Sequence, residues 1–211
     1  MITLAMVLAA QATAADRLRA ALDAAERSAS ITYAFTAKVR PSGGDALSYD
    51  GRGVALSGGR LQTQIKLSPG RGDQRIRVGP EGVELHNEFA GWEKSTDPSL
   101  GRGFENPWVV LAEMRRRIEG VADDGKGTLA LRLEGAAAVE TLAALKIQEE
   151  GLVAEGTWVE LTARLAAGRL DRVGCRARAR LADRPDLPAH VDAEVGVTVE
   201  AYDRDKELTW R

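Results

Sequence analysis

Hydrophobic side chains recur at helical spacing in three separate segments of the chain. Residues 15–29 place apolar side chains on one face and charged ones on the other, which predicts an amphipathic helix. Asn106 and Pro107 have the form of an N-cap followed by proline at the first helical position, so a second amphipathic helix is predicted that ends at Gly120. Residues 136–148 are rich in alanine and leucine and form the third predicted helix.

Elsewhere the pattern changes to alternation, or to short apolar runs between turn residues. A period of two is typical of β-strands with one buried face. The predicted strands are 31–39, 47–56, 60–67, 75–78, 83–86, 91–94, 128–133, 157–166, 169–181 and 191–202. Most connections are short, which favours antiparallel pairing. The element order therefore predicts the α+β class, with one extended sheet and a few helices on one of its faces.

The strand predicted at 169–181 has two faces of different chemistry. One face is apolar, and the other is dominated by arginine: Arg172, Arg176, Arg178 and Arg180. If Leu181 lies opposite Val191, carboxylates of the neighbouring strands compensate much of this charge. That register pairs Arg180 with Asp192, Arg178 with Glu194 and Arg172 with Glu200, and Glu160 on the preceding strand can face Arg176. The arginine face is therefore interpreted as a solvated ladder of cross-strand pairs and not as a nucleic-acid site.

The apolar face of the same strand carries small side chains. Cys175, Ala177 and Ala179 point inward together, and alanines recur inward on the neighbouring strands. A sheet in a tightly packed two-layer core needs large residues unless a helix comes very close. Two interpretations stay open at this point: a closely docked helix, such as 136–148, or a hollow left for an apolar ligand.

Composition narrows the choice of function mainly by exclusion. The 211 residues are 44% hydrophobic and 28% charged with a formal net charge of −2, which suits one soluble domain and disfavours a polyanion-binding protein. One cysteine allows no internal disulfide, and the two histidines lie in no metal-binding frame. The segment 120–126 matches the start of a phosphate-binding P-loop, but Gly127 replaces the required Ser or Thr, so a helix-to-strand turn is predicted. No enzyme, metal or cofactor is expected; the rival hypothesis is an enzyme whose site leaves no sequence pattern.

The first fourteen residues have features of a short signal peptide. Residues 2–10 are apolar, and Ala12-Thr13-Ala14 resembles a signal-peptidase site before Ala15, although no Lys or Arg precedes the run. Export to the periplasm or out of the cell is the favoured interpretation, with 15–211 as a single domain. The alternative is the N-terminal turn of a helix in a cytosolic protein. No later segment reaches the length of a membrane span.

Several stretches share their order and pattern with a known superfamily over most of 15–208. They are the helix DRLRAALDAAERSAS with the strand ITYAFTAKV, the meander GRGVALSGGRLQTQIKL, the strand end GWEKS, the helix NPWVVLAEMRRRIEGV and the closing TWVELTARLAAGRLDRVGCRARARL. This layout resembles the bacterial lipoprotein-carrier superfamily, which includes periplasmic lipoprotein chaperones and related glycolipid carriers. The resemblance implies a strongly curved, incomplete antiparallel barrel of roughly 10–11 strands with helices across its concave face.

The resemblance also implies a carrier or binder of a lipid or lipidated protein, with acyl chains held in a hollow under a helical lid. An acyl chain gains about 0.8 kcal/mol per CH₂ buried from water, so binding needs no catalytic residue. The expected lid is hinged by the loop 96–105 and consists of Phe104, Trp108, Leu111 and Met114. The expected wall of the hollow consists of Val173, Cys175, Ala177, Ala179, Val195 and Val197.

The partners that follow from this hypothesis are a lipid or acyl-chain ligand and membrane-bound donor and acceptor proteins. No nucleic acid is expected as a partner, and a monomer is expected. The rival hypothesis on the same scaffold is a non-catalytic envelope sensor or interaction module with a collapsed interior.

Overall fold

The chain folds into one long sheet with a layer of helices on one of its faces. The computed structural model describes residues 13–67, 73–87, 89–97, 100, 103, 106–183 and 187–204. The helices are α1 (Ala14–Arg27), α2 (Pro107–Arg116) and α3 (Ala136–Ala144). The strands are β1 (Ser30–Pro41), β2 (Leu47–Leu56), β3 (Arg60–Leu67), β4 (Asp73–Gly79), β5 (Gly82–Asn87), β6 (Gly91–Lys94), β7 (Ala122–Asp123), β8 (Thr128–Glu134), β9 (Trp158–Ala166), β10 (Arg169–Arg180) and β11 (His190–Tyr202). Short 3₁₀ turns follow β2 and α2.

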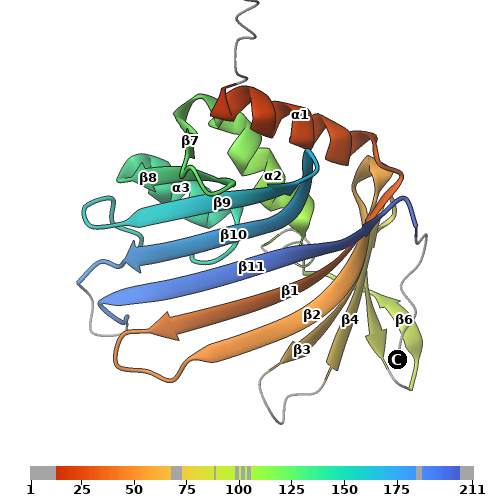
Figure 1. The fold of residues 1–211 in the computed structure, drawn as a ribbon. Helices are drawn as coiled ribbons and strands as arrows, with labels where there is room; N and C mark the ends of the chain where they lie inside the picture. Colours follow the sequence, from red (N-terminus) through yellow and green to blue (C-terminus); the bar gives the residue numbers. More distant parts are fainter. Residues whose placement is uncertain are drawn as a thin grey trace, which may run out of the picture.

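The strands form a single antiparallel sheet that is curved but not closed. Its order is β6-β5-β4-β3-β2-β1-β11-β10-β9-β8-β7, which makes eleven strands in the part of the chain described. The first strand, β1, pairs with the last, β11, near the middle of the sheet. The edges β6 and β7 do not pair with each other (Figure 1). The fold is therefore α+β with an incomplete antiparallel barrel.

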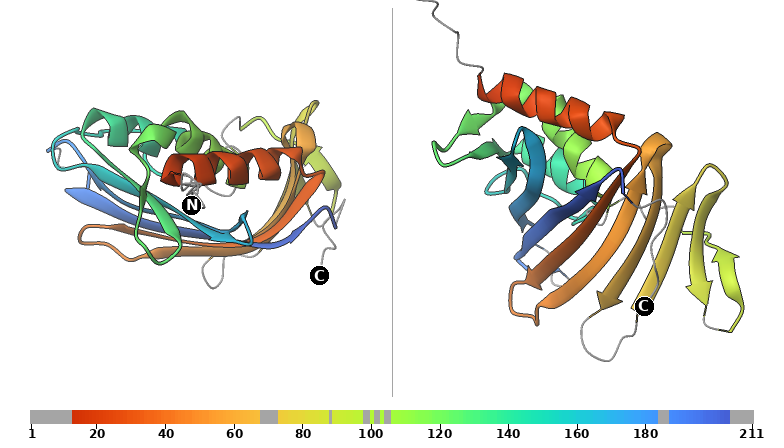
Figure 2. Two further views of the ribbon diagram at one scale, coloured as in Figure 1. Left: turned by 45° about the horizontal axis from the view of Figure 1, so that its top comes forward. Right: turned by 45° about the vertical axis from the view of Figure 1, so that its right-hand side comes forward.

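The helices lie across the concave face of the sheet, as the left-hand view of Figure 2 shows. α1 and α3 both pack on β10, and α2 lies against α1 and α3. The buried residues of α1 follow the helical repeat i, i+3, i+4, i+7 and are Leu18, Ala21, Leu22 and Ala25. They join the inward side chains of the strands in one apolar core.

Helix α1 begins at a capping box. The hydroxyl of Thr13 accepts a hydrogen bond from the Asp16 N–H at 3.1 Å, and the Asp16 carboxylate accepts one from the Thr13 N–H at 3.3 Å. The apolar run of the predicted signal peptide lies outside the described residues. Cleavage after Ala14, at the predicted site, would remove Thr13 and with it the cap of this helix.

Two aromatic side chains of β1 lie over glycines of β2. A Cβ atom on Gly51 would stand 2.5 Å from Cε1 of Phe35, and one on Gly53 would stand 2.5 Å from the hydroxyl of Tyr33. Both rings are at most 2% exposed. β2 therefore has glycine at these positions because the aromatic rings occupy the space that its side chains would need.

The sequence pattern predicted the bounds of the strands more accurately than the ends of the helices. β2, β3 and β6 have the predicted bounds, and the other predicted strands differ by at most two residues at either end. β7 was missed because two residues show no period. α2 ends at Arg116, before a 3₁₀ turn, and α3 ends at Ala144 instead of 148. Lys146 has a φ of 55°, which an α-helix does not accommodate.

The predicted register between β10 and β11 is wrong by two residues. The observed pairs are Arg180 with His190, Arg178 with Asp192, Arg176 with Glu194 and Arg172 with Thr198. On the other side, Glu160 lies opposite Arg176, as predicted. A shift of two residues leaves every side chain on its predicted face, so the alternation is equally consistent with both registers.

Candidate functional site

The predicted wall residues lie side by side on the concave face of β10 and β11. Val173 pairs with Val197 and Cys175 with Val195, and the alanines of β10 continue the same face. All six predicted wall residues are between 1% and 3% exposed. A hollow wide enough for water would leave these side chains accessible. The interior beside them is therefore filled in this structure.

Helices and the segment after α3 cover this wall. α1 and α3 pack on β10, where the small side chains allow a close approach. Beyond α3, the N–H of Val153 donates to the carbonyl of Arg180 at 2.9 Å, and Leu152 forms an isolated bridge with Leu181. Of the two interpretations that the sequence left open, closely docked helices describe this conformation, and an open hollow beside β10 does not.

The described part of the predicted lid belongs to α2. Oδ1 of Asn106 accepts a hydrogen bond from the Trp108 N–H at 3.0 Å, which confirms the predicted N-cap. Met114 is fully buried and Leu111 is 6% exposed. Trp108 is only half-buried, and its buried indole N–H has no hydrogen-bond partner among the described residues. Phe104 and much of the predicted hinge loop lie outside the described residues.

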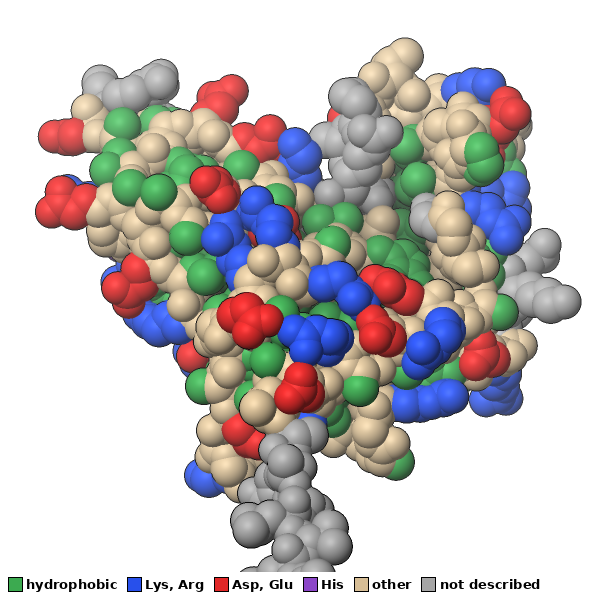
Figure 3. Space-filling model, turned by 90° about the horizontal axis from the view of Figure 1, so that it is seen from above, with side chains coloured by type: hydrophobic (Ala, Val, Ile, Leu, Met, Phe, Trp, Pro, Cys, Tyr) green, Lys and Arg blue, Asp and Glu red, His purple; other side chains and the backbone are tan. Residues whose placement is uncertain are grey.

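Ion pairs join the helical layer into one unit. The pairs are Arg115 with Asp23 and Glu26, Arg116 and Arg117 with Glu140, and Arg19 with Glu119. Figure 3, which looks down on α1, shows acidic and basic side chains mixed over this surface. Within the described ranges, the ion pair that links a helix to the sheet is Arg17 with Asp123 on the edge strand β7. The helices otherwise meet the sheet through apolar side chains.

The surface is hollowed between the helical side of the molecule and the side formed by β4 to β6. Figure 3 shows this notch between its two lobes, with hydrophobic side chains at the floor. On the sheet side, the inward residues of β3 to β5 include Leu61, Ile76 and Val83, all at most 7% exposed. The apolar interior thus comes near the surface between the helices and this part of the sheet.

Groups suited to catalysis are not assembled in the described interior. Burial raises the pKa of the Cys175 thiol to about 12, so the thiol is protonated near neutral pH. No group of three or more His, Cys, Asp or Glu side chains in the described ranges is placed to hold a metal ion. No helix among the same residues is both long and apolar enough to cross a bilayer.

The P-loop-like segment forms a turn that leads into β8. The carboxylate of Asp124 accepts hydrogen bonds from the backbone N–H groups of Lys126, at 2.7 Å, and Thr128, at 3.0 Å. These bonds, first that from Lys126, hold the pKa of Asp124 below its ordinary value. The backbone donors that a phosphate would need are therefore occupied by a carboxylate of the chain itself.

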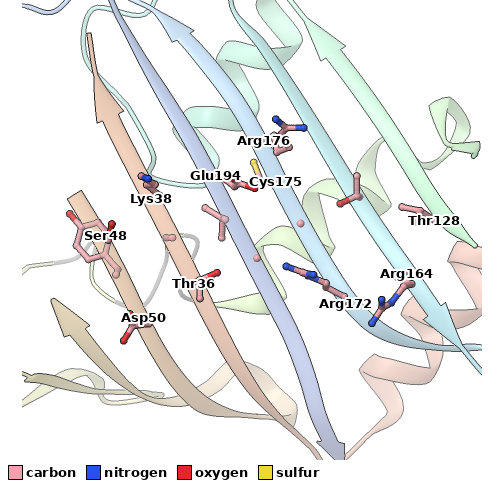
Figure 4. Close-up of a pocket in the computed structure, with 16 residues that line it drawn as sticks. Thr36, Lys38, Ser48, Asp50, Thr128, Arg164, Arg172, Cys175, Arg176 and Glu194 are labelled. Carbon is pink, nitrogen blue, oxygen red and sulfur yellow. The ribbon is translucent and has the colours of Figure 1, made fainter. Parts of the chain in front are cut away.

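A second candidate site lies on the opposite, helix-free face of the sheet. Figure 4 shows a groove that crosses β1, β11, β10 and β9, with a volume of about 460 Å³. Its floor carries small side chains because Thr36, Gly196, Gly174 and Thr162 are register partners on four successive strands. Arg172 and Arg176 rise on either side of Gly174. A smaller hollow of about 300 Å³ shares Arg176 and continues past it toward Trp158.

The charges around this groove are only partly compensated. The groove is lined by the cations Lys38, Arg164, Arg172 and Arg176 and by the carboxylates Asp50 and Glu194. Among the described residues, Lys38, Arg172 and Arg176 make no ion pair, whereas Arg164 pairs with Asp171. Within the described part of the chain, Arg178 is the one arginine of the predicted ladder that makes an ion pair, and its partner is Asp192 instead of the predicted Glu194. Arg178 donates two hydrogen bonds to Asp192 at 2.7 and 3.1 Å and holds the pKa of Asp192 below its ordinary value.

Two glycines are the sequence signal for this groove. Gly174 and Gly196 each interrupt the polar face of a strand that otherwise carries mainly charged residues. Only the true register places the two glycines opposite each other and so turns two separate gaps into one depression.

Comparisons with known proteins find only remote similarity to solved structures. No protein-family model matches the chain, and no curated protein matches it significantly. Among solved structures, a LolA superfamily protein from Nitrosomonas europaea is 9% identical with a TM-score of 0.38, covering 95% of this chain and 96% of that one. A DUF1329 family protein from Desulfovibrio piger is 9% identical (TM-score 0.30; 93% of each chain). A domain described as a candidate outer membrane lipoprotein-sorting protein, from Vibrio parahaemolyticus, is also 9% identical (TM-score 0.31; 92% and 95%).

The resemblance to the LolA-like superfamily is thus one of remote similarity to solved structures. At these TM-scores it adds nothing on ligand or partner.

Proposed function

We propose that the protein binds acyl chains of a lipid or lipidated protein between the sheet and its helical cover, without catalysing a reaction. One observation carries the proposal: the concave face of the central strands is apolar along its whole length. On β10 and β11 it consists of the six wall residues together with Leu170, Val191, Ala193 and Val199. On these two strands the face is complementary to a hydrocarbon chain, because it carries no charged side chain that would have to be desolvated.

The cover is built so that it can part from this face. Its ion pairs run within the helical layer or to the edge strand β7, and α1 and α3 contact the central strands through apolar side chains. The segment after α3 is the exception, because the N–H of Val153 donates to the carbonyl of Arg180 at the end of β10. An entering acyl chain therefore replaces one set of apolar contacts by another and leaves few polar groups unsatisfied. In this proposal, the acyl chain enters at the notch between the helices and β4 to β6 (Figure 3).

The energies permit binding only if the cover parts at low cost. A sixteen-carbon chain with about 15 CH₂ groups gains about 12 kcal/mol when it is buried. Association of two molecules costs about 4–15 kcal/mol. The net free energy of binding that remains is small. The free energy needed to open the helical cover therefore decides whether the protein carries a ligand or stays empty.

Placement in the cell envelope belongs to the same proposal. A carrier of this kind would work in the periplasm, where it would receive its ligand from one membrane-bound protein and release it to another. The short apolar N-terminal segment supports export.

A non-catalytic interaction module is the second candidate, and the filled interior favours it. Each wall residue is at most 3% exposed, so the conformation described offers an acyl chain no space beside β10. In that case the same scaffold would contact partners through its surface, and the helices would stay docked.

Binding of an uncharged apolar probe tests the proposal. We expect the full chain to bind N-phenyl-1-naphthylamine with saturable fluorescence, and native mass spectrometry of the freshly purified protein to show a copurified lipid mass. Ala177→Trp places a large ring on the concave face and should abolish probe binding. Arg180→Trp is the matched control on the outer face of the same strand and should leave binding unchanged.

The outcomes separate the two candidates. A clean mass of the empty chain and no probe binding by the wild type would exclude the carrier and leave the interaction module. Unchanged binding in a folded Ala177→Trp variant would show that the ligand lies elsewhere. If Ala177→Trp does not fold, Ala177→Leu gives the same comparison, because overpacking by a smaller group costs about 1–3 kcal/mol.

A further inference from the structure

The helix-free face of the sheet carries a groove whose chemistry differs from that of the apolar interior. Twelve of its sixteen lining residues, two of them glycines, occupy outward positions that alternate with the buried positions of β1, β2, β8, β9, β10 and β11. We infer that the groove is a binding site for a small organic anion that carries phosphate or carboxylate groups. The site is independent of the proposed acyl-chain site, because the sheet separates the two.

Two guanidinium groups are placed to hold such an anion from opposite sides. Arg172 and Arg176 flank Gly174 on β10 and point to the same face of the sheet. Four residues of strand span about 13 Å, so side chains leaning inward can converge on one ligand above the glycine. Guanidinium groups are suited to this task because their planar donors match the oxygens of carboxylate and phosphate groups.

Polar side chains lean over the glycine backbone at the floor of the groove. A Cβ atom on Gly196 would stand 3.3 Å from Nη2 of Arg172 and 3.5 Å from Oγ1 of Thr36, and one on Gly174 would stand 2.6 Å from Oγ1 of Thr162. The glycines therefore leave room for these donors, which a larger side chain at either position would displace. The two threonine hydroxyls add neutral donors at the floor.

The electrostatic balance favours an anion. The lining holds four cations and two carboxylates, and Arg172, Arg176 and Lys38 have no ion pair among the described residues. Cations held together without partners raise the local concentration of anions. The groove of about 460 Å³ also falls in the size range of small-molecule sites, which is about 300–1,000 Å³.

The same charges limit the size of the ligand. Glu194 lies beside the groove next to Arg176, and Glu160 lies on the other side of that arginine. A long polyanion laid across the strands would meet these carboxylates and be repelled. A small phosphorylated or carboxylated molecule over the glycines avoids them.

Amide chemical shifts give the most specific test. Titration of the ¹⁵N-labelled full chain with glycerol 3-phosphate at low ionic strength should shift the amide signals of Gly174 and Gly196. Arg172→Gln and Arg176→Gln should each weaken binding about tenfold, the loss expected for one charge-assisted hydrogen-bonding partner. Arg180→Gln is the control: the same change on the same face of β10, outside the groove lining.

A second arm of the experiment distinguishes whether the anion is a lipid headgroup or a free metabolite. Phosphatidylcholine vesicles with and without phosphatidylglycerol test a lipid headgroup, and glycerol 3-phosphate tests a free metabolite. Binding to the anionic vesicles that depends on Arg172 and Arg176 supports the site with a headgroup as its ligand, even if free glycerol 3-phosphate does not bind.

Two results would overturn the inference. One is the absence of binding in both arms. The other is an equal loss of binding in Arg180→Gln and in the groove variants, which would indicate general attraction to surface charge. Neither result bears on the acyl-chain proposal, because N-phenyl-1-naphthylamine is uncharged and its binding is measured separately.

Discussion

Cys175 can measure how often the helical cover leaves the concave face. It is the single cysteine of the chain, it lies in the predicted wall, and it is 1% exposed. Iodoacetamide reacts with its thiol only when the cover is open. We predict that Arg115→Met accelerates this alkylation, because an opening in which α1 parts from α2 breaks the ion pairs of Arg115 with Asp23 and Glu26.

The expected acceleration follows from the geometry of the lost contacts. Arg115 lies 2.7 Å from Asp23 and 3.2 Å from Glu26, and the three side chains are 36%, 40% and 57% exposed. Ion pairs this exposed are screened by solvent and contribute about 0.2–1 kcal/mol each. A total near 1 kcal/mol corresponds to about a fivefold rise in the open population and in the alkylation rate.

The assay follows alkylation by intact mass at pH 8 in increasing low concentrations of urea. The pH matters because burial raises the pKa of this thiol to about 12 in the folded chain, against about 8.5 when it is exposed. The contribution of the neutral buried thiol to the free energy of unfolding is fully present below about pH 8.5. Between about pH 8.5 and 12 the thiol ionises in the unfolded chain but not in the folded one, so this contribution is lost as the pH rises. Opening of the cover should show a much weaker dependence on urea than global unfolding does.

Arg132→Met is the matched control. It removes an exposed ion pair with Glu134, at 3.0 Å, together with the contact of Arg132 with the Trp158 ring, on the outer face of the sheet. Our reasoning about the cover fails if both variants accelerate alkylation equally, or if the urea dependence matches that of global unfolding. In either case Cys175 would be exposed only when the whole domain unfolds.

Three further predictions concern stability. Gly51→Ala should lower the free energy of unfolding by about 1–3 kcal/mol in urea titrations, because its Cβ would press on a ring of β1 and on the backbone of β3. The control is Gly79→Ala, which has open space around the new Cβ and should change the free energy of unfolding by less than about 0.5 kcal/mol. Thr13→Ala should cost about 1 kcal/mol through loss of the capping box, and a chain cleaved after residue 14 should show a similar deficit; equal stability would mean that the cap is not needed. The hydrogen bonds from Arg178 lower the pKa of Asp192, so their contribution is present above about pH 4 and is lost as the pH falls through the lowered pKa. The stability difference between wild type and Arg178→Gln should therefore shrink between about pH 4 and pH 2 and should not change above pH 5.

The sequence by itself determined the elements and their faces. Alternation is a local property of the backbone, because successive side chains of a strand point to opposite sides. For this reason the bounds of β2 and β3, the inward position of Cys175 and the outward position of Arg176 followed directly from residue order. The cap at Asn106 followed in the same way, from a side chain that bonds to the backbone two residues on.

Only the tertiary structure decided what these faces meet. The register of β10 against β11 is set by contacts between distant segments, and a shift by two residues leaves the local pattern unchanged. That shift paired Arg178 with Asp192, placed Arg172 opposite Thr198 instead of a carboxylate, and aligned the two glycines that form the groove.

The filled interior is a tertiary property for the same reason. Small side chains at Ala177 and Ala179 fit a docked helix and a hollow equally well. The difference depends on how closely α1, α3 and the segment after α3 approach the sheet, and that distance is fixed by packing across the whole core. Residue order specifies which surfaces are apolar, but the space between two such surfaces exists only once both are folded.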